Sequence, residues 1–178
     1  MYCGTDPLLA SGPDGQVIEI EVCWSADRAQ GEAWLKKLRA FGKPTHDGIA
    51  PMPYVKLQTS GDELLKVGGY YYMKSGMLTQ LKDEGIDIII DSFRRMPNWY
   101  LLFFDHCGGA YRHQAPAATA FPNRDMLFTL GAHSIWPSRD CIEEKTALMR
   151  ANWEGIGAAY EGLLYQLRGL GRDDRRVS

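Results

Sequence analysis

Alternating apolar and polar positions predict most of the strands in this chain of 178 residues. In VIEIEVCW, residues 17–24, one set of alternate positions is apolar and the other is mixed, which is typical of a half-buried strand. Residues 51–63 contain two prolines and little periodicity, so they are expected to form a loop that leads into a short extended piece. Further strands are expected over residues 67–76, 98–107, 110–115 and 125–136.

Apolar residues at helical spacing predict three helices. The first follows Ser25 or Asp27, either of which can cap it, and runs to about Phe41. The other two are expected over residues 76–95 and 137–167, the second of them broken near residues 155–157. Closely spaced strands favour antiparallel pairing, so the expected fold class is α+β, an antiparallel β-sheet with helices packed on one face.

Length and charge indicate one globular domain with two short extensions. The expected boundaries are an N-terminal arm over residues 1–16, an α+β domain over 17–167 and a flexible charged tail over 168–178. The net charge is −2 and there is no basic stripe, so nucleic acid is not an expected partner. No apolar run approaches the ~20 residues that cross a bilayer, and the start lacks signal-peptide features, so a cytoplasmic protein without a membrane partner is expected.

Searches for standard sites give negative results. Cys3, Cys23, Cys107 and Cys141 form no CxxC pair and have no histidine at metal-ligand spacing, so reduced thiols and no metal site are expected. The chain contains no GxGxxG, P-loop, GxSxG or HExxH pattern. Any chemistry must therefore come from residues outside these motifs.

The end of the apolar strand over 98–107 carries the main catalytic candidate. A carboxyl group there, Asp105, could have a raised pKa and act as a base; alternatively, it makes a turn with the glycines that follow. His106 is adjacent, and neighbouring strand residues point to opposite faces, so the two side chains cannot share one face. Tyr111 and His113 would share a face of a regular strand and could orient a ligand there, or they could simply line an exposed face.

Other polar and aromatic residues have ordinary structural explanations. Tyr70, Tyr71 and Tyr72 fit core and sheet surface, although aromatic side chains also line ligand pockets. His133 lies among apolar residues, which favours a hydrogen-bonded core histidine. Arg124 is interpreted as a structural clamp that needs a carboxylate or carbonyl partner.

Several pieces of the chain, in order, resemble the FAD-linked oxidases of the berberine bridge enzyme type. The pieces are KPTHDGIAPMPYVKLQTSGDE at 43–63, YYYMKSGML at 70–78, GGAYRHQAPAATAFPNR at 108–124, and Trp136. The resemblance covers roughly residues 17–161. The chain departs from the family pattern at Asn123, where many members have histidine, and at EGLLYQL, residues 161–167.

The resemblance implies a substrate-binding (cap) domain, whose antiparallel sheet covers the flavin and holds a small-molecule substrate. It implies FAD bound mainly by a domain not present in this chain, with an FAD-binding domain or subunit as partner and little activity for the chain alone. A base removes a proton in such enzymes while hydride passes to the flavin. The residues expected at this site are Asp105 as base or orienting carboxylate, and Tyr70, Tyr72, His106, Tyr111 and His113 as substrate contacts.

A different class of function also fits the sequence. The chain could be a non-enzymatic α+β module that forms a homodimer or binds a partner through the same face, because many aromatic residues and apolar strands would leave surface to cover.

Overall fold

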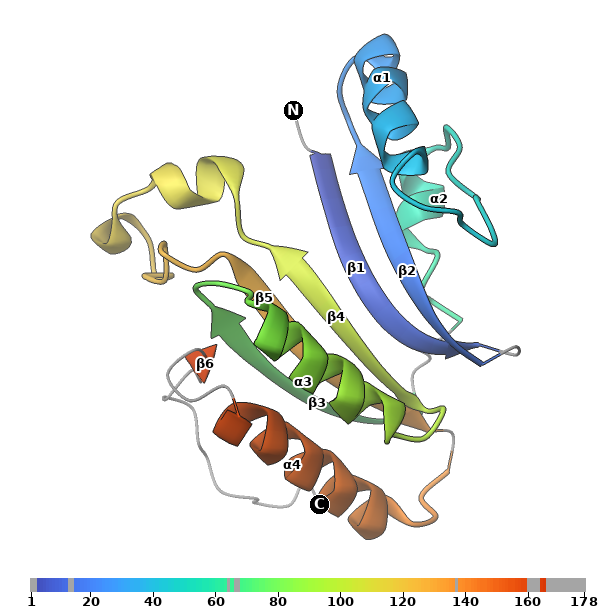
Figure 1. Ribbon diagram of the computed structural model, residues 1–178, viewed down its shortest axis with the longest axis vertical. Helices are drawn as coiled ribbons and strands as arrows, with labels where there is room; N and C mark the ends of the chain where they lie inside the picture. Colours follow the sequence, from blue (N-terminus) through green and yellow to red (C-terminus); the bar gives the residue numbers. More distant parts are fainter. Residues whose placement is uncertain are drawn as a thin grey trace.

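The computed structural model describes residues 3–12, 15–63, 65, 68–136, 138–159 and 164–165. They form a six-stranded sheet, ordered β2-β1-β4-β5-β3-β6, in which every neighbouring pair is antiparallel (Figure 1). The strands are β1 (Cys3–Gly12), β2 (Gly15–Trp24), β3 (Tyr70–Leu78), β4 (Tyr100–His106), β5 (Phe128–Trp136) and β6 (Leu164–Tyr165). This arrangement confirms the α+β class.

The first strand was not expected, because residues 1–16 were interpreted as an arm outside the domain. Instead, β1 pairs with β2 along its whole length and with β4 at Leu8 and Leu9. The small residues and the proline in CGTDPLLASG hide the alternation that marks a strand. The N-terminal segment is therefore an interior strand between β2 and β4.

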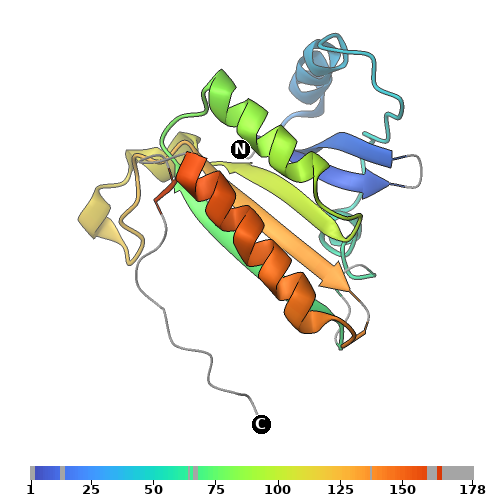
Figure 2. The same ribbon diagram turned by 60° about the horizontal axis from the view of Figure 1, so that its bottom comes forward.

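Two long helices, α3 (Asp83–Arg94) and α4 (Ile142–Ala159), lie on the same face of the sheet (Figure 2). The helix expected from residue 76 begins at Asp83, because residues 76–78 continue β3 and pair with β5. The break expected near residues 155–157 is also wrong, since α4 runs through both glycines. No helix among the described residues is long and apolar enough to span a membrane.

The hydrophobic core lies between these helices and alternate residues of β3, β4 and β5. Each large apolar side chain buried in this way contributes about 1.5–3 kcal/mol relative to an exposed one. The core includes Leu78, Ile89, Phe93, Leu102, Leu130, Met149, Trp153 and Ile156. Burying this set on one face leaves the other face of the same strands without a helix layer.

A buried polar network links the helix layer to β4. The Ser92 hydroxyl donates to the Asn152 carbonyl at 2.6 Å, and the Asn152 amide donates to the Tyr100 hydroxyl at 2.8 Å. Burial raises the pKa of Tyr100 and outweighs the opposing effect of the Asn152 hydrogen bond. The phenol therefore stays neutral, and Asn152 joins both helices to the sheet.

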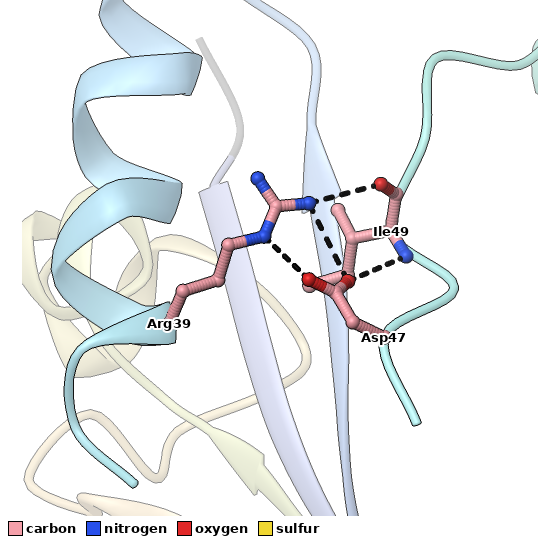
Figure 3. Close-up of polar contacts among 3 residues, drawn as sticks. All are labelled: Arg39, Asp47 and Ile49. Atoms are coloured by element: carbon pink, nitrogen blue, oxygen red, sulfur yellow. Dashed lines mark hydrogen bonds and ion pairs between the residues drawn. The ribbon is translucent and has the colours of Figure 1, made fainter. Parts of the chain in front are cut away.

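The segment between β2 and β3 lies at the other side of the molecule. Asp27 caps α1 (Arg28–Arg39) by accepting a hydrogen bond from the Gln30 backbone at 3.0 Å, and a short α2 (Tyr54–Gln58) forms where only a loop was expected. In Figure 3, Arg39 binds Asp47 at 2.5 Å and the Ile49 carbonyl at 3.2 Å. These contacts hold the loop beside α1, and the Arg39 hydrogen bond lowers the pKa of Asp47.

Removing the shared amide tests the buried network. Asn152→Ala is expected to lower the free energy of unfolding by about 1–3 kcal/mol, because it leaves the Ser92 and Tyr100 hydroxyls buried without partners. Denaturant unfolding measures this change, and Asn98→Ala, at an exposed position, is the matched control. Equal losses in the two variants would contradict the network's role.

Candidate functional site

The face of β3, β4 and β5 that points away from α3 and α4 is the candidate site, and no described helix covers it (Figure 2). We call this surface the open face. Strand register assigns alternate residues to it, because side chains of paired residues point to the same side. Its residues are Tyr71, Met73, Ser75 and Met77 of β3, Leu101, Phe103 and Asp105 of β4, and Thr129, Gly131, His133 and Ile135 of β5.

The centre of the open face is an edge-to-face contact between aromatic rings of neighbouring strands. Phe103 pairs with Gly131, and its ring lies where a β-carbon on residue 131 would stand, so the two groups would collide if residue 131 had a side chain. The ring meets the His133 imidazole edge-on, with centroids 4.5 Å apart. We call Phe103, Gly131 and His133 the central plate.

Burial changes the chemistry of the histidine in this plate. His133 is half-buried, and burial lowers its pKa. The imidazole is therefore neutral near pH 7 and can accept a proton or a hydrogen bond. The earlier interpretation of His133 as a core histidine placed it on the wrong side of the sheet.

One end of the open face is acidic. Burial raises the pKa of Asp105, and the carboxylates of Asp6 on β1 and Glu21 on β2 raise it further. Asp6 pairs with Glu21 in the hairpin, and its carboxylate also accepts the backbone N–H of His106 at 3.4 Å. Burial and the like charges at this end of the sheet therefore both disfavour the carboxylate form of Asp105.

The segment after β4 does not form the strand expected over residues 110–115. It is a 3-10 helix, Gly109–His113, because Gly109 adopts a positive φ of 61° and turns the chain out of the sheet. Tyr111 and His113 therefore share no strand face. Tyr111 donates its hydroxyl proton to the Asn123 carbonyl, and His113 is exposed.

Arg124 holds this segment together, as the clamp interpretation predicts. Its guanidinium donates to the Tyr111 carbonyl at 3.2 Å and to the Thr119 hydroxyl. It also lies over the rings of Tyr111 and Phe121, at 5.2 and 5.6 Å from their centroids. The segment is a packed scaffold beside the sheet.

Three of the expected substrate contacts lie on the side of the helices. Tyr70 and Tyr72 share a face with core residues, and the Tyr72 hydroxyl accepts a hydrogen bond from Arg150 of α4 at 3.0 Å. His106 packs against Phe128, with ring centroids 5.4 Å apart. The structure therefore brings none of Tyr70, Tyr72, His106, Tyr111 and His113 to the open face with Asp105.

The sequence contained a signal for the residues that were missed. Counting back from Asp105 in steps of two gives Phe103 and Leu101, and strand pairing adds His133 from β5. Among the described residues no cluster of His, Cys, Asp or Glu could hold a metal ion, and Cys23, Cys107 and Cys141 are free thiols. The site is therefore an aromatic surface with one imidazole and one acidic end.

Comparisons with known proteins match this fold to part of larger flavoenzymes. No family model matches the sequence. An FAD-linked oxidoreductase of Dictyostelium discoideum is 27% identical over 129 residues, which cover 71% of this chain and 28% of that protein. The chain thus spans well under half of that relative.

Solved structures show the same fold at low identity. A berberine bridge enzyme variant, described as a reticuline dehydrogenase, matches 92% of this chain and 35% of its own, with a TM-score of 0.71 and 10% identity. The 6-hydroxy-D-nicotine oxidase of Arthrobacter nicotinovorans matches 92% and 37%, with a TM-score of 0.71 and 13% identity. Aclacinomycin oxidoreductase matches 88% and 33%, with a TM-score of 0.66 and 17% identity. The expected resemblance is thereby confirmed: this chain is similar, in sequence and fold, to about one third of an FAD-linked oxidoreductase of the berberine bridge enzyme type.

Proposed function

We propose that this chain is the substrate-binding domain of an FAD-dependent oxidoreductase, and that its open face lies against the flavin and a small-molecule substrate. The observation that carries the proposal is the central plate. Phe103 and His133 are only half-buried on a sheet face that no described helix covers, whereas Leu102 and Leu130 of the same strands are fully buried on the opposite face. An aromatic surface of this kind suits a planar ring.

The residues of this chain fit one part of FAD and not another. The plate suits the face of the isoalloxazine ring, because it is aromatic and half-exposed, and Gly131 leaves the Phe103 ring room against the strand. The sequence has no GxGxxG or P-loop turn for the pyrophosphate. FAD would therefore be held mainly by another domain or subunit, and it supplies the hydride acceptor when bound.

Asp105 has a distinct role in this proposal. It lies two residues from Phe103 on the same face of β4, about 7 Å along the strand. Its carboxylate is thus at the edge of the plate, where it can bind a donor group of the substrate and orient the ring. The carboxylates of Asp6 and Glu21 add negative charge at the same end.

The division of the site between two modules predicts that the chain alone does not hold FAD. After incubation with FAD and desalting, the 178-residue chain is expected to be colourless. Retention of stoichiometric yellow flavin, measured by absorbance, would contradict this division of the site.

A lysine placed on the plate tests whether the open face binds rings. Met73 is 50% exposed and pairs with His133. The probe is lumiflavin, a flavin ring without phosphates. Met73→Lys is expected to weaken lumiflavin binding about tenfold, because it puts a charge on an apolar surface. Quenching of flavin fluorescence measures this. The matched control is Leu148→Lys on α4, where Leu148 is 41% exposed. Equal weakening in the two variants would contradict ring binding at the open face. If the chain is instead a dimer and Met73→Lys makes it monomeric, the dimerisation module is favoured.

Because the pKa of Asp105 is raised, replacing its carboxyl group with a neutral amide should stabilise the folded chain, by an amount that depends on pH. The folded state disfavours the carboxylate, so the wild-type chain loses stability as pH rises from the unfolded value, about 3.9, through the folded pKa. Asp105→Asn is therefore expected to be more stable than wild type at pH 7, with the difference vanishing below about pH 3.9. Thermal unfolding against pH measures this, with Asp62→Asn at an exposed position as control. A less stable Asp105→Asn chain at pH 7 would contradict the assignment.

A further inference from the structure

The strand β2 stands at one end of the six-stranded sheet, and among the described residues it pairs with β1 alone (Figure 1). The pairing runs without interruption from Gly15 to Trp24, so the strand has no bulge. It also contains no proline and no lysine, two residue types that protect natural edge strands from pairing. The outer edge of β2 therefore offers a row of backbone N–H and C=O groups to a further strand.

The exposed part of this strand is the stretch from Gly15 to Glu21, in which only Val17 is half-buried. Its midpoint is Ile18, which lies on the helix side of the sheet because it pairs with the core residue Leu9. The Ile18 side chain is nevertheless 67% exposed, and that of Ile20, on the same side, is 39% exposed. The sheet thus ends in apolar side chains that nothing among the described residues covers.

The far end of β2 differs from this exposed stretch. Residues 22–24 are half-buried, and the Trp24 ring lies so close to Gly31 of α1 that a β-carbon there would collide with it. Figure 1 shows α1 beside this end of the strand. A partner strand is therefore expected along residues 15–21, centred on Ile18.

A second copy of the same strand fits this edge. Two β2 strands related by a two-fold axis perpendicular to the sheet run antiparallel, and side chains of one face pair with side chains of the same face. Centred on Ile18, this register pairs Ile18 with its own copy, Glu19 with Val17 and Glu21 with Gly15. Each glutamate then lies opposite an uncharged residue, whereas a register centred on any of the next three residues would put glutamate opposite glutamate.

The remaining charges oppose this pairing only weakly. The two Glu19 side chains lie on a diagonal in this register, and Glu19 is exposed, so water and salt screen their repulsion. The net charge of the whole chain is only −2, so two copies repel each other little.

We propose that the outer edge of β2 is a dimerisation surface, at which two copies of this chain pair antiparallel about Ile18. The two sheets join into one, with the α3 and α4 helices of both copies on one side and both open faces on the other. The exposed Ile18 and Ile20 side chains of both copies are covered in the process. Because the edge and the open face are separate surfaces, this dimer does not require the function proposed above.

Sedimentation velocity of the 178-residue chain over a range of concentrations measures the dimer. The contact is shorter than a standard interface, so a reversible dimer with a dissociation constant of about 1–100 μM is expected. Ile18→Lys puts a cation opposite its own copy and is expected to raise this constant about tenfold or more. The matched control is Met73→Lys, at a 50% exposed apolar residue of the open face, which should leave the dimer unchanged. Circular dichroism checks that both variants are folded.

Disulfide formation tests the register. Ile18→Cys brings two thiols face to face at the axis, so mild oxidation is expected to give a covalent dimer. Ile20→Cys is the matched control on the same side of the same strand. Residue 20 pairs with residue 16 of the other copy, so its two thiols stand about 13 Å apart along the strand. Both variants also carry Cys141→Ser, which removes an exposed native thiol.

Three results would overturn the dimer. A chain that stays monomeric at about 1 mM would show that copies do not pair, and the edge would then suit a strand of a different protein. A dimer that Ile18→Lys leaves unchanged, or that cross-links better at residue 20 than at residue 18, would contradict the register. A dimer that dissociates with Met73→Lys and not with Ile18→Lys would put the contact on the open face, against both this dimer and the function proposed above.

Discussion

The register of β5 against its two neighbours is the constraint on which the rest of this structure depends. Because side chains alternate along a strand, a slip of one residue would move Leu130 and Ala132 to the open face and Gly131 and His133 into the core. The observed register puts a glycine opposite Phe103 and a buried leucine opposite Phe104. A core and a binding surface thus come from consecutive residues of one strand.

The two faces of the sheet differ in how they are covered. The helices bury the apolar residues of one face and leave the other face exposed. On the helix side, close packing of Leu102, Leu130 and Met149 leaves room for polar groups only where partners exist, as at Ser92, Asn152 and Tyr100. On the open face, Phe103 keeps its ring partly in water while it contacts Gly131 and His133. In the proposed function, the flavin-binding module and the substrate cover this half-exposed ring.

Local rules predicted the elements where a residue's neighbours in sequence determine its environment. The cap of α1 by Asp27, the strands β2, β4 and β5, the clamp at Arg124 and the opposite directions of Asp105 and His106 all follow from short-range patterns. Where distant pairing decides, prediction failed. β1 is stabilised by β2 and β4 despite its proline, residues 110–115 leave the sheet at Gly109, and the core assignment of His133 ignored the register that turns it outward. Periodicity shows that a strand has two faces, but only pairing with the other strands shows which face the helices cover.

Burial acts on Asp105 and His133 of the open face in the same sense, because it favours the uncharged form of each. It raises the pKa of Asp105 and lowers that of His133. If a flavin-binding module covers this face, further loss of water would extend both changes, so association would favour a neutral acid at one end of the plate and a neutral base at its centre. A positive charge from the covering module or the substrate would oppose this further rise in the pKa of Asp105. The acidic end would then select partners or substrates that carry a cation there, while the central plate would still accept an uncharged ring.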